Sequence, residues 1–453
     1  MTKAGFVFLV LIAGALALAQ PAGSANVRED QGQAPDGAVH PAAEYSAGAG
    51  TKQEEIRSSE QLTLQKCIEI ALRNQPGIAV ARSAVLANQS RVGQAQSAYY
   101  PQIGLSGGYF AGSSGSGADR SGDEFTAGVT LSQNIYDFGR TFSQVSVRRF
   151  GLDAARSDLE DVTVQTVFRV KGAYYAVLQA KRNRELAEEV VGQFRQHLDQ
   201  AKNFVRVGIS PRFDVIKAEV DLSNAQLNLI RAGNSLRLAF ANLSNIMGVP
   251  DATDYGIEDN LTFEKYEATF DKALSRAMAN RQDMSSARAK IRAAEQSVAF
   301  ARAGAFPTLT GSAAYGRAGD GFLAQEDWSA GVTVSLPLFN GFLTRHQIAE
   351  AEANLKAQIA QAELLRQAID LDVRQAFLNL KEAEERIPAA ELAVKQATEG
   401  LAIPNGRYTT GVGSPIEVTD AQAAYSNAKS AYIQALSDYK TAIASLERAQ
   451  GER

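Results

Sequence analysis

Residues 127–132 read Ala-Gly-Val-Thr-Leu-Ser, and residues 330–335 read Ala-Gly-Val-Thr-Val-Ser. The same offset pairs further identical residues, namely Gly208 with Gly411, Val215 with Val418, and Gly248 with Gly451. Upstream of these positions the offset shifts by about three residues, and the match continues. Two related copies of about 190 residues predict one duplicated unit rather than two unrelated domains.

Each copy of the repeated stretch lies in a segment that alternates apolar and small polar residues. The alternation runs through residues 125–136 and 328–339, and it is weaker in the partner segments 102–111 and 308–316. A period of two is typical of a β-strand with one apolar face. Strands of about 10 residues have the length that crosses a membrane in a tilted barrel. The sequence therefore predicts four membrane strands in the chain.

Helices are expected on both sides of the strands. Leu64 to Arg73 is predicted as a short helix with Thr63 as its N-cap. A second helix, predicted over 77–98, ends before Pro101, which has no amide hydrogen to donate.

Very long helices follow the strands. Residues 138–207 contain no proline and little glycine, and about 70 helical residues extend roughly 100 Å. The breaks at 208–211 and 411–415 separate the long helices, 138–207 and 342–410, from second helices at 212–247 and 416–449. Pro388 and Pro404 predict kinks in the long helix of the second copy. Helices of this length are expected to pack side by side as coiled-coil hairpins, because a globular core cannot use them.

The chain divides into five parts on this basis. Residues 1–25 have the basic start and apolar core of a signal peptide, with cleavage expected after Ala19 or Ala25. Residues 26–61 are read as a flexible N-terminal segment. The first repeat is 62–248, a connector is 249–268, and the second repeat is 269–451. After the signal no apolar run reaches 18 residues, so no transmembrane helix is expected.

Composition argues against several functions. The chain has 453 residues, a formal net charge of −4 and one cysteine. The charge gives no case for nucleic-acid binding. Cys67 is interpreted as a small buried residue, and His40, His197 and His346 as surface residues without metal-ligand spacing. No phosphate loop, nucleophile elbow or histidine-based acid–base pair is present, so neither an enzyme nor a cofactor is expected.

Four strands cannot close a barrel, and an open sheet in lipid would leave unpaired backbone groups. Three chains would supply twelve strands, an even number within the known range. The predicted fold class is therefore mainly α with a β-barrel portion. The duplicated unit contributes long coiled-coil α-hairpins that form an α-barrel and four membrane strands per chain, which make a 12-stranded barrel in a homotrimer.

The sequence resembles the outer membrane efflux family of TolC-like trimeric exit ducts over about 62–451. The resemblance rests on the order and spacing of several motifs rather than on any one of them. These are Leu64-x-x-Cys67-Ile68-x-x-Ala71-Leu72, Tyr100-Pro101 and Phe306-Pro307 before the strands, the segment 336–341, and Phe213-Asp214-Val215 paired with Ile416-Glu417-Val418. The resemblance implies a barrel in the outer membrane of a Gram-negative bacterium and a periplasmic α-barrel. It also implies a periplasmic adaptor and an inner-membrane transporter as partners.

The resemblance also suggests a pore constriction. Asp214 and Glu417 lie at equivalent positions after the helix breaks, and Asp420 follows one turn later. Threefold symmetry would place three copies of each carboxylate around one axis, where they would favour cations. The alternative is that acidic residues in a first helical turn only stabilise the helix dipole. Lys217 stands where the first copy would mirror Asp420, which lowers the net charge there.

Gate and docking contacts are expected near the same breaks. Gly413 stands where some family members have an arginine that helps to hold the entrance shut. Other groups must then form the lock, and the candidate gate contacts are Arg212, Arg407 and Tyr408, with helix-seam packing as the alternative for Tyr408. The tips expected to face the adaptor contain Gly208, Pro211, Gly411 and Pro415, whose alternative role is only to turn the chain.

Two questions stay open at this point. Aromatic residues at the strand ends suit a membrane-interface belt, with packing inside the trimer as the alternative; they are Tyr136, Phe138, Phe339 and Phe342. The second question is the function itself, since a structural or adhesive coiled-coil protein of the envelope would also explain the helices. That alternative leaves the paired membrane-length strands unexplained.

Overall fold

The computed structural model describes residues 61–113, 121–250, 255–319 and 325–453. The signal peptide and almost all of the expected flexible segment lie outside these ranges. The described residues form two units, a β unit within 96–141 and 306–337 and a helical unit that contains the rest. Both units draw on both copies of the repeat.

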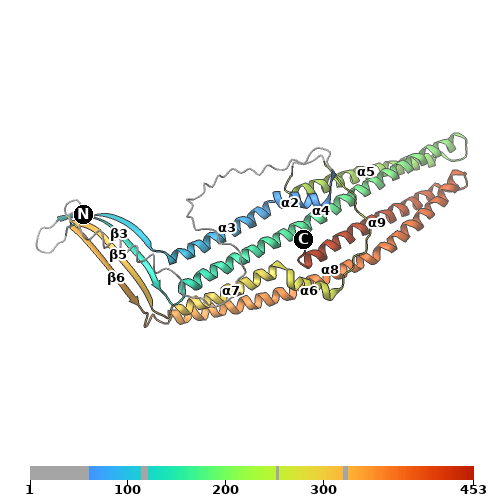
Figure 1. Ribbon diagram of the computed structural model, residues 1–453. Helices are drawn as coiled ribbons and strands as arrows, with labels where there is room; N and C mark the ends of the chain where they lie inside the picture. Colours follow the sequence, from blue (N-terminus) through green and yellow to red (C-terminus); the bar gives the residue numbers. More distant parts are fainter. Residues whose placement is uncertain (1–60, 114–120, 251–254, 320–324) are drawn as a thin grey trace. The chain divides into compact units, whose positions relative to one another are not determined.

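The β unit is one antiparallel sheet with the strand order β2-β3-β5-β6 (Figure 1). The strands are β2 (Gln102–Ser113), β3 (Ser121–Tyr136), β5 (Thr308–Gly319) and β6 (Gln325–Ser335). Strand β6 ends at Ser335, short of the predicted residue 339, and Pro337 follows, which cannot donate to a ladder. Strands β3 and β5 pair side by side, so the sheet joins the two copies. Within the described residues, the outer edges of β2 and β6 carry no partner strand.

The two faces of this sheet differ in chemistry. The ladder registers place large apolar side chains on one face, and most of these are exposed in the single chain: Ile103, Leu105, Tyr109, Val129, Tyr315, Trp328, Val332 and Val334. The opposite face carries small polar residues such as Thr126, Thr130, Ser132, Ser312 and Thr333. An exposed apolar face of this size needs a covering, which for a membrane strand is lipid.

A β-bulge adjusts the end of β3. Asn134 pairs with Thr310 while Tyr136 pairs with Leu309, so Ile135 is the extra residue. The bulge brings Tyr136 onto the apolar face, where its ring contacts Phe138 at 4.8 Å between centroids. Phe138 stacks on Phe306 at 5.3 Å. These rings are exposed at one end of the sheet, where they can meet either a membrane interface or a second copy of the chain.

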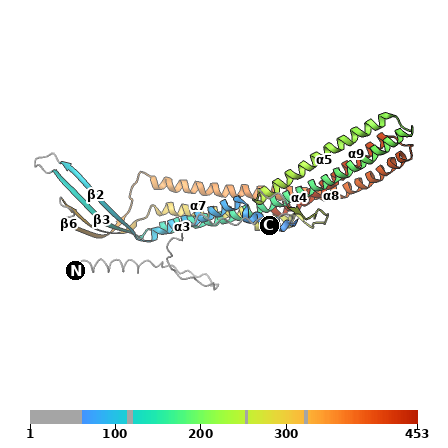
Figure 2. The same cartoon turned by 90° about the horizontal axis from the view of Figure 1, so that it is seen from above.

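Within the described residues, the helical unit holds two pairs of short helices and two long hairpins, and the hairpins can be followed in Figure 2. The short pairs are α2 (Leu64–Asn74) with α3 (Pro76–Gln96), and α6 (Phe270–Asn280) with α7 (Gln282–Ala303). The hairpins are α4 (Arg140–Arg206) with α5 (Arg212–Met247), and α8 (Leu343–Thr409) with α9 (Pro415–Ala449). The Thr63 side chain caps α2 by accepting from the amide of Lys66 at 3.2 Å. Helix α8 runs without interruption through Pro388 and Pro404.

The main core of this unit lies where the short helices meet the long ones. Cys67 is fully buried there, and burial raises the pKa of its thiol to about 12, which makes it unreactive. The expected connector is a packed segment rather than a simple link, because Tyr174 donates to Glu258 O at 2.6 Å and Tyr439 to Glu264 O at 2.9 Å. Its short strand β4 (Gly256–Ile257) pairs in parallel with β1 (Gln61–Leu62). Gln61 therefore belongs to the fold, and its assignment to a flexible segment was wrong.

Both copies of the repeat have a glycine at the end of their last helix, next to this core. Gly248 and Gly451 both have φ +76°, a left-handed conformation that suits glycine. A Cβ at Gly248 would lie 2.6 Å from Asn74 O, and one at Gly451 would lie 3.0 Å from the backbone of Arg281. Each copy therefore ends its last helix against the junction of its own short helices.

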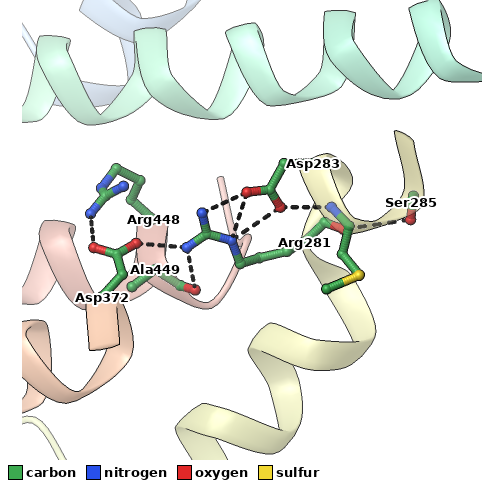
Figure 3. Close-up of polar contacts among 7 residues, drawn as sticks. Arg281, Asp283, Ser285, Asp372, Arg448 and Ala449 are labelled. Atoms are coloured by element: carbon green, nitrogen blue, oxygen red, sulfur yellow. Dashed lines mark hydrogen bonds and ion pairs between the residues drawn. The ribbon is translucent and has the colours of Figure 1, made fainter. Parts of the chain in front are cut away.

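The second copy adds a charge network at this place (Figure 3). Arg281, between α6 and α7, lies 2.7 Å from Asp283 and 2.6 Å from Asp372 of α8. Arg448 of α9 reaches the other oxygen of Asp372 at 2.7 Å. Burial alone would raise the pKa of Asp372, but the hydrogen bonds from both arginines outweigh it and lower this pKa. The network therefore connects α7, α8 and α9 through one carboxylate.

No helix among the described residues combines the length and the apolar character needed to cross a membrane.

Candidate functional site at the hairpin tips

The tips of both hairpins are built in the same way. Gly208 has φ +80° and Gly411 has φ +79°, so each ends a long helix in the left-handed conformation. Ile209 N donates to Phe204 O at 2.9 Å, and Val412 N donates to Arg407 O at 3.1 Å. These are the six-residue hydrogen bonds of a Schellman motif, which satisfy the last carbonyls of α4 and α8.

Proline begins the return helix at each tip. Pro211 immediately precedes α5, and Pro415 is the first residue of α9. Its fixed φ and missing amide hydrogen suit a helix start. Ser414 adds a side-chain cap, accepting from Ile416 N at 3.3 Å. A Cβ at Gly411 would meet Cγ2 of Ile209 at 3.9 Å, so the two tips lie next to each other at one end of the helical unit (Figure 1).

Gly413 is required by the backbone of the second tip. A Cβ at this position would lie 2.7 Å from Tyr408 N and 2.9 Å from Arg407 C. Real Cβ atoms do not approach so closely, so no larger side chain fits this turn. The backbone of this turn therefore explains why glycine, and not a residue with a side chain, stands at this position.

The three predicted constriction carboxylates lie near these tips. Asp214 is half-buried in the first turn of α5, whereas Glu417 and Asp420 are exposed at the start of α9. Arg407, in the last turn of α8, lies 3.4 Å from Glu417, and both side chains are about half exposed. An exposed pair of this kind contributes about 0–1 kcal/mol, so it lowers the local charge without fixing the tip.

Of the other candidate gate contacts, Arg212 is the exposed first residue of α5 and Tyr408 is buried. Only 2% of Tyr408 is exposed. Its ring stacks on His197 of α4, with centroids 4.5 Å apart and planes at 14°, and it meets the edge of Phe204 at 5.5 Å. Burial raises the pKa of Tyr408, and the charge of Asp214 raises it further. Tyr408 therefore packs in the seam between the first and second hairpins.

The prediction that His197 lies at the surface was wrong, and the role of Asp221 was not predicted. His197 is 8% exposed and not a surface residue, whereas His346 is exposed as expected. Lys217 and Asp221 form an ion pair at 3.0 Å, and Thr419 of α9 donates to Asp221 at 3.2 Å. Lys217, which differs from the acidic residue at the equivalent position of the second copy, thus pairs with a carboxylate that links the two hairpins. No cluster of metal-ligating side chains occurs in the part of the chain that the structure describes.

The tips also expose large apolar side chains. These are Val207, Ile209 and Phe213 on the first hairpin and Ile403, Val412 and Ile416 on the second, each more than half exposed. Solvated helix ends seldom carry so many, and such residues mark a surface for another protein.

Together, an amphipathic sheet with one apolar face and long helical hairpins with exposed apolar tips define a channel protein of the outer membrane. The chain belongs to the outer membrane efflux protein family, whose model matches residues 67–249 and again residues 273–452. The double match coincides with the duplication.

Individual relatives agree with this assignment. The chain is 28% identical to protein CyaE of Bordetella pertussis over 405 residues, covering 87% of this chain and 85% of the relative. It is 26% identical to the outer membrane protein TolC of Vibrio cholerae, covering 80% and 84% of the two chains. The solved structure of the Campylobacter jejuni CmeC outer membrane channel has the same fold, with a TM-score of 0.78 at 16% identity, covering 92% and 94% of the two chains.

Proposed function

We propose that three copies of this chain form the exit duct of a tripartite efflux or type I secretion system, gated at the hairpin tips. The observation that carries this proposal is the pair of unpaired edges on a sheet with an apolar face. In lipid, each unpaired backbone group costs several kcal/mol, so β2 and β6 need partners. Strand β6 is antiparallel to β5 and therefore runs opposite to β2. The β6 strand of one copy can thus pair with β2 of the next in an antiparallel barrel of twelve strands.

Exposed apolar rows on the helices support the same assembly. Leu364, Leu371 and Leu378 follow a seven-residue spacing on α8, and Leu392 lies two such intervals further on, beyond Glu385; each leucine is more than half exposed. Phe213, Val220 and Leu227 follow the same spacing on α5, with Ile216 and Ile230 as second positions. Rows of this kind are the seams of coiled coils. Neighbouring copies would cover them and close an α-barrel.

The tips would then form the narrow entrance. Three copies of Asp420 and Asp214 around one axis would give a negative ring that attracts cations and resists closure. The negative charge of Glu417 is partly offset by Arg407, so Glu417 would contribute less to this ring. The exposed apolar residues beside Gly208, Pro211, Gly411 and Pro415 would contact the periplasmic adaptor, which links the duct to an inner-membrane transporter.

The test is conductance of the purified protein in planar bilayers. Asp420→Ala is expected to reduce cation selectivity more than Glu417→Ala does, because Arg407 already offsets Glu417. Arg407→Ala should increase selectivity by freeing the Glu417 charge. Unchanged selectivity and conductance in all three variants would remove these residues from the constriction.

The competing function, an adhesive coiled-coil protein, makes a different prediction about assembly. A duct gives a heat-modifiable trimer band from outer-membrane fractions and conducts ions. A protein recovered as a monomer from the periplasm, with no conductance, would contradict the proposal. Val332→Lys on the apolar face should deplete the trimer, whereas Thr333→Lys on the opposite face should be tolerated better.

A further inference from the structure

The seam between the hairpins contains a buried pair of titratable rings. His197 and Tyr408 stack across the seam and are 8% and 2% exposed. His197 comes from the last third of α4 and Tyr408 from the last turn of α8. The contact therefore joins the two hairpins a short distance from their tips.

The polar atoms of this pair are buried without hydrogen-bond partners among the described residues. They are Nδ1 and Nε2 of His197 and the hydroxyl of Tyr408. Gln193, one turn from His197 on the same face of α4, also has a buried side-chain oxygen without a partner. Buried polar groups in native proteins are almost always paired. The closed seam leaves several such groups unpaired, so it is only slightly more stable than an open seam in which water can hydrogen-bond to them.

The charged surroundings of His197 come from α5. Asp221 has the largest electrostatic effect on the pKa of His197, followed by Lys217 and then Asp214. Helix α9 contributes Thr419, which donates a hydrogen bond to Asp221. From α8 the facing titratable group is Tyr408 itself. Burial lowers the pKa of His197 most strongly, the two aspartates raise it, Lys217 lowers it, and the net direction is down.

We propose that His197 is a proton-sensitive latch for the gate: the neutral imidazole holds the second hairpin against the first, and protonation releases it. This inference rests on the proposed function, since it concerns the same tips. A protonated ring in the seam would bury a charge and two N–H donors without acceptors. Attraction between an imidazolium and the Tyr408 ring offsets only part of that cost.

The direction of the pH effect follows from the lowered pKa. A histidine that is exposed after release has a pKa near 6.5. Above that value both arrangements hold neutral histidine, and the docked arrangement keeps its full stability. As the pH falls below about 6.5, the released arrangement binds a proton and the docked one does not. The ratio of released to docked hairpins then rises by up to about tenfold per pH unit in each chain.

The experiment compares single-channel open probability at pH 7.5 and 5.5 for the full-length protein and three variants. His197→Phe keeps the ring stack but cannot take a proton, so it should stay closed at both pH values. His197→Lys places a charge in the seam and should be open already at pH 7.5. His346→Phe, at the exposed histidine of α8, is the matched control and should keep the wild-type response.

The outcomes separate this inference from the proposed function. A pH response that persists in His197→Phe, or a response lost in His346→Phe, would overturn the latch. If His197→Lys fails to give a trimer band, the result for His197→Phe still decides. The Asp420→Ala selectivity change at pH 7.5 reports on the duct alone. Conductance with normal selectivity but no pH response would therefore reject the latch and leave the duct standing.

Discussion

Arg281→Gln should weaken the helical unit by removing one arginine from the charge network of the second copy. The first copy shows what glutamine can do at this place, because Gln75 occupies the equivalent position and donates to Ile246 O at 3.1 Å. Arg281 makes the corresponding bond to Ala449 O at 3.4 Å. The substitution can therefore keep this backbone contact while it removes the ion pairs to Asp283 and Asp372.

The expected loss is about 2–4 kcal/mol per chain. The upper end applies to fully buried pairs, and these groups are partly exposed, at 12% for Arg281 and 28% for Asp372. For the ~380 residues that the structure describes, the unfolding entropy is near 0.8 kcal/mol per kelvin, so the midpoint should fall by roughly 2–5 °C. Thermal unfolding of the detergent-solubilised protein, followed by far-UV circular dichroism at one scan rate, measures this change.

The matched control is Arg276→Gln. Arg276 lies 3.3 Å from Glu452 but its side chain is 56% exposed, so its loss should cost less than about 1 kcal/mol. Equal midpoints for the two variants would refute the reasoning. The pKa of Asp372 is lowered in the folded state, so its stabilisation is complete above about pH 4 and is lost as the pH falls through the folded value. The difference between Arg281→Gln and wild type should therefore shrink in acid.

Two further predictions concern glycines. Gly248→Ala should destabilise the protein by more than about 2 kcal/mol, because its Cβ would meet Asn74 O at 2.6 Å at a positive φ; Gly233→Ala, in open space within α5, should instead raise the midpoint slightly. Thermal unfolding distinguishes the two, and equal effects would contradict the assignment. Gly413→Ala should shift the second tip by forcing Tyr408 N away, and cysteine labelling at Val412 would register the change as an altered rate. An unaltered rate would show that the turn can accept a side chain.

Most of the fold could be predicted from local signals in the sequence. The alternation through Ala127 and Ala330 predicts the strands because a pleated strand has only two faces. Glycine at 208 and 411, each followed by a proline four or fewer residues later, predicts the hairpin tips because the conformations they need are intrinsic to those residues. The bulge at Ile135 left no such signal, since it depends on how β3 and β5 pair.

The candidate site was harder to predict, because its contacts join residues far apart in the chain. The sequence placed Asp214, Glu417 and Asp420 at helix starts, where one local rule suffices. Nothing in the sequence around His197 indicates that its side chain is buried. It is buried because it stacks on Tyr408, which lies in the other copy of the repeat. The same holds for Asp221, whose partner Thr419 is on α9. Periodicity and capping signals are properties of single elements, whereas these pairs form only when the two hairpins pack together.

The two copies have the same residue where the backbone conformation requires it. They have different residues where more than one side chain can make the same contact. Gly248 and Gly451 have the same φ because each helix end must approach a helix junction closely, and no other residue can do this without strain. The contact beside them needs only one donor to a carbonyl, so Gln75 serves in the first copy and Arg281 in the second. An arginine leaves further donors, and Asp283 and Asp372 take them. The second hairpin is thereby anchored by charge at its base, while its tip is held by the uncharged rings of His197 and Tyr408. A perturbation that adds charge at the tip should then move the tip and leave the base in place.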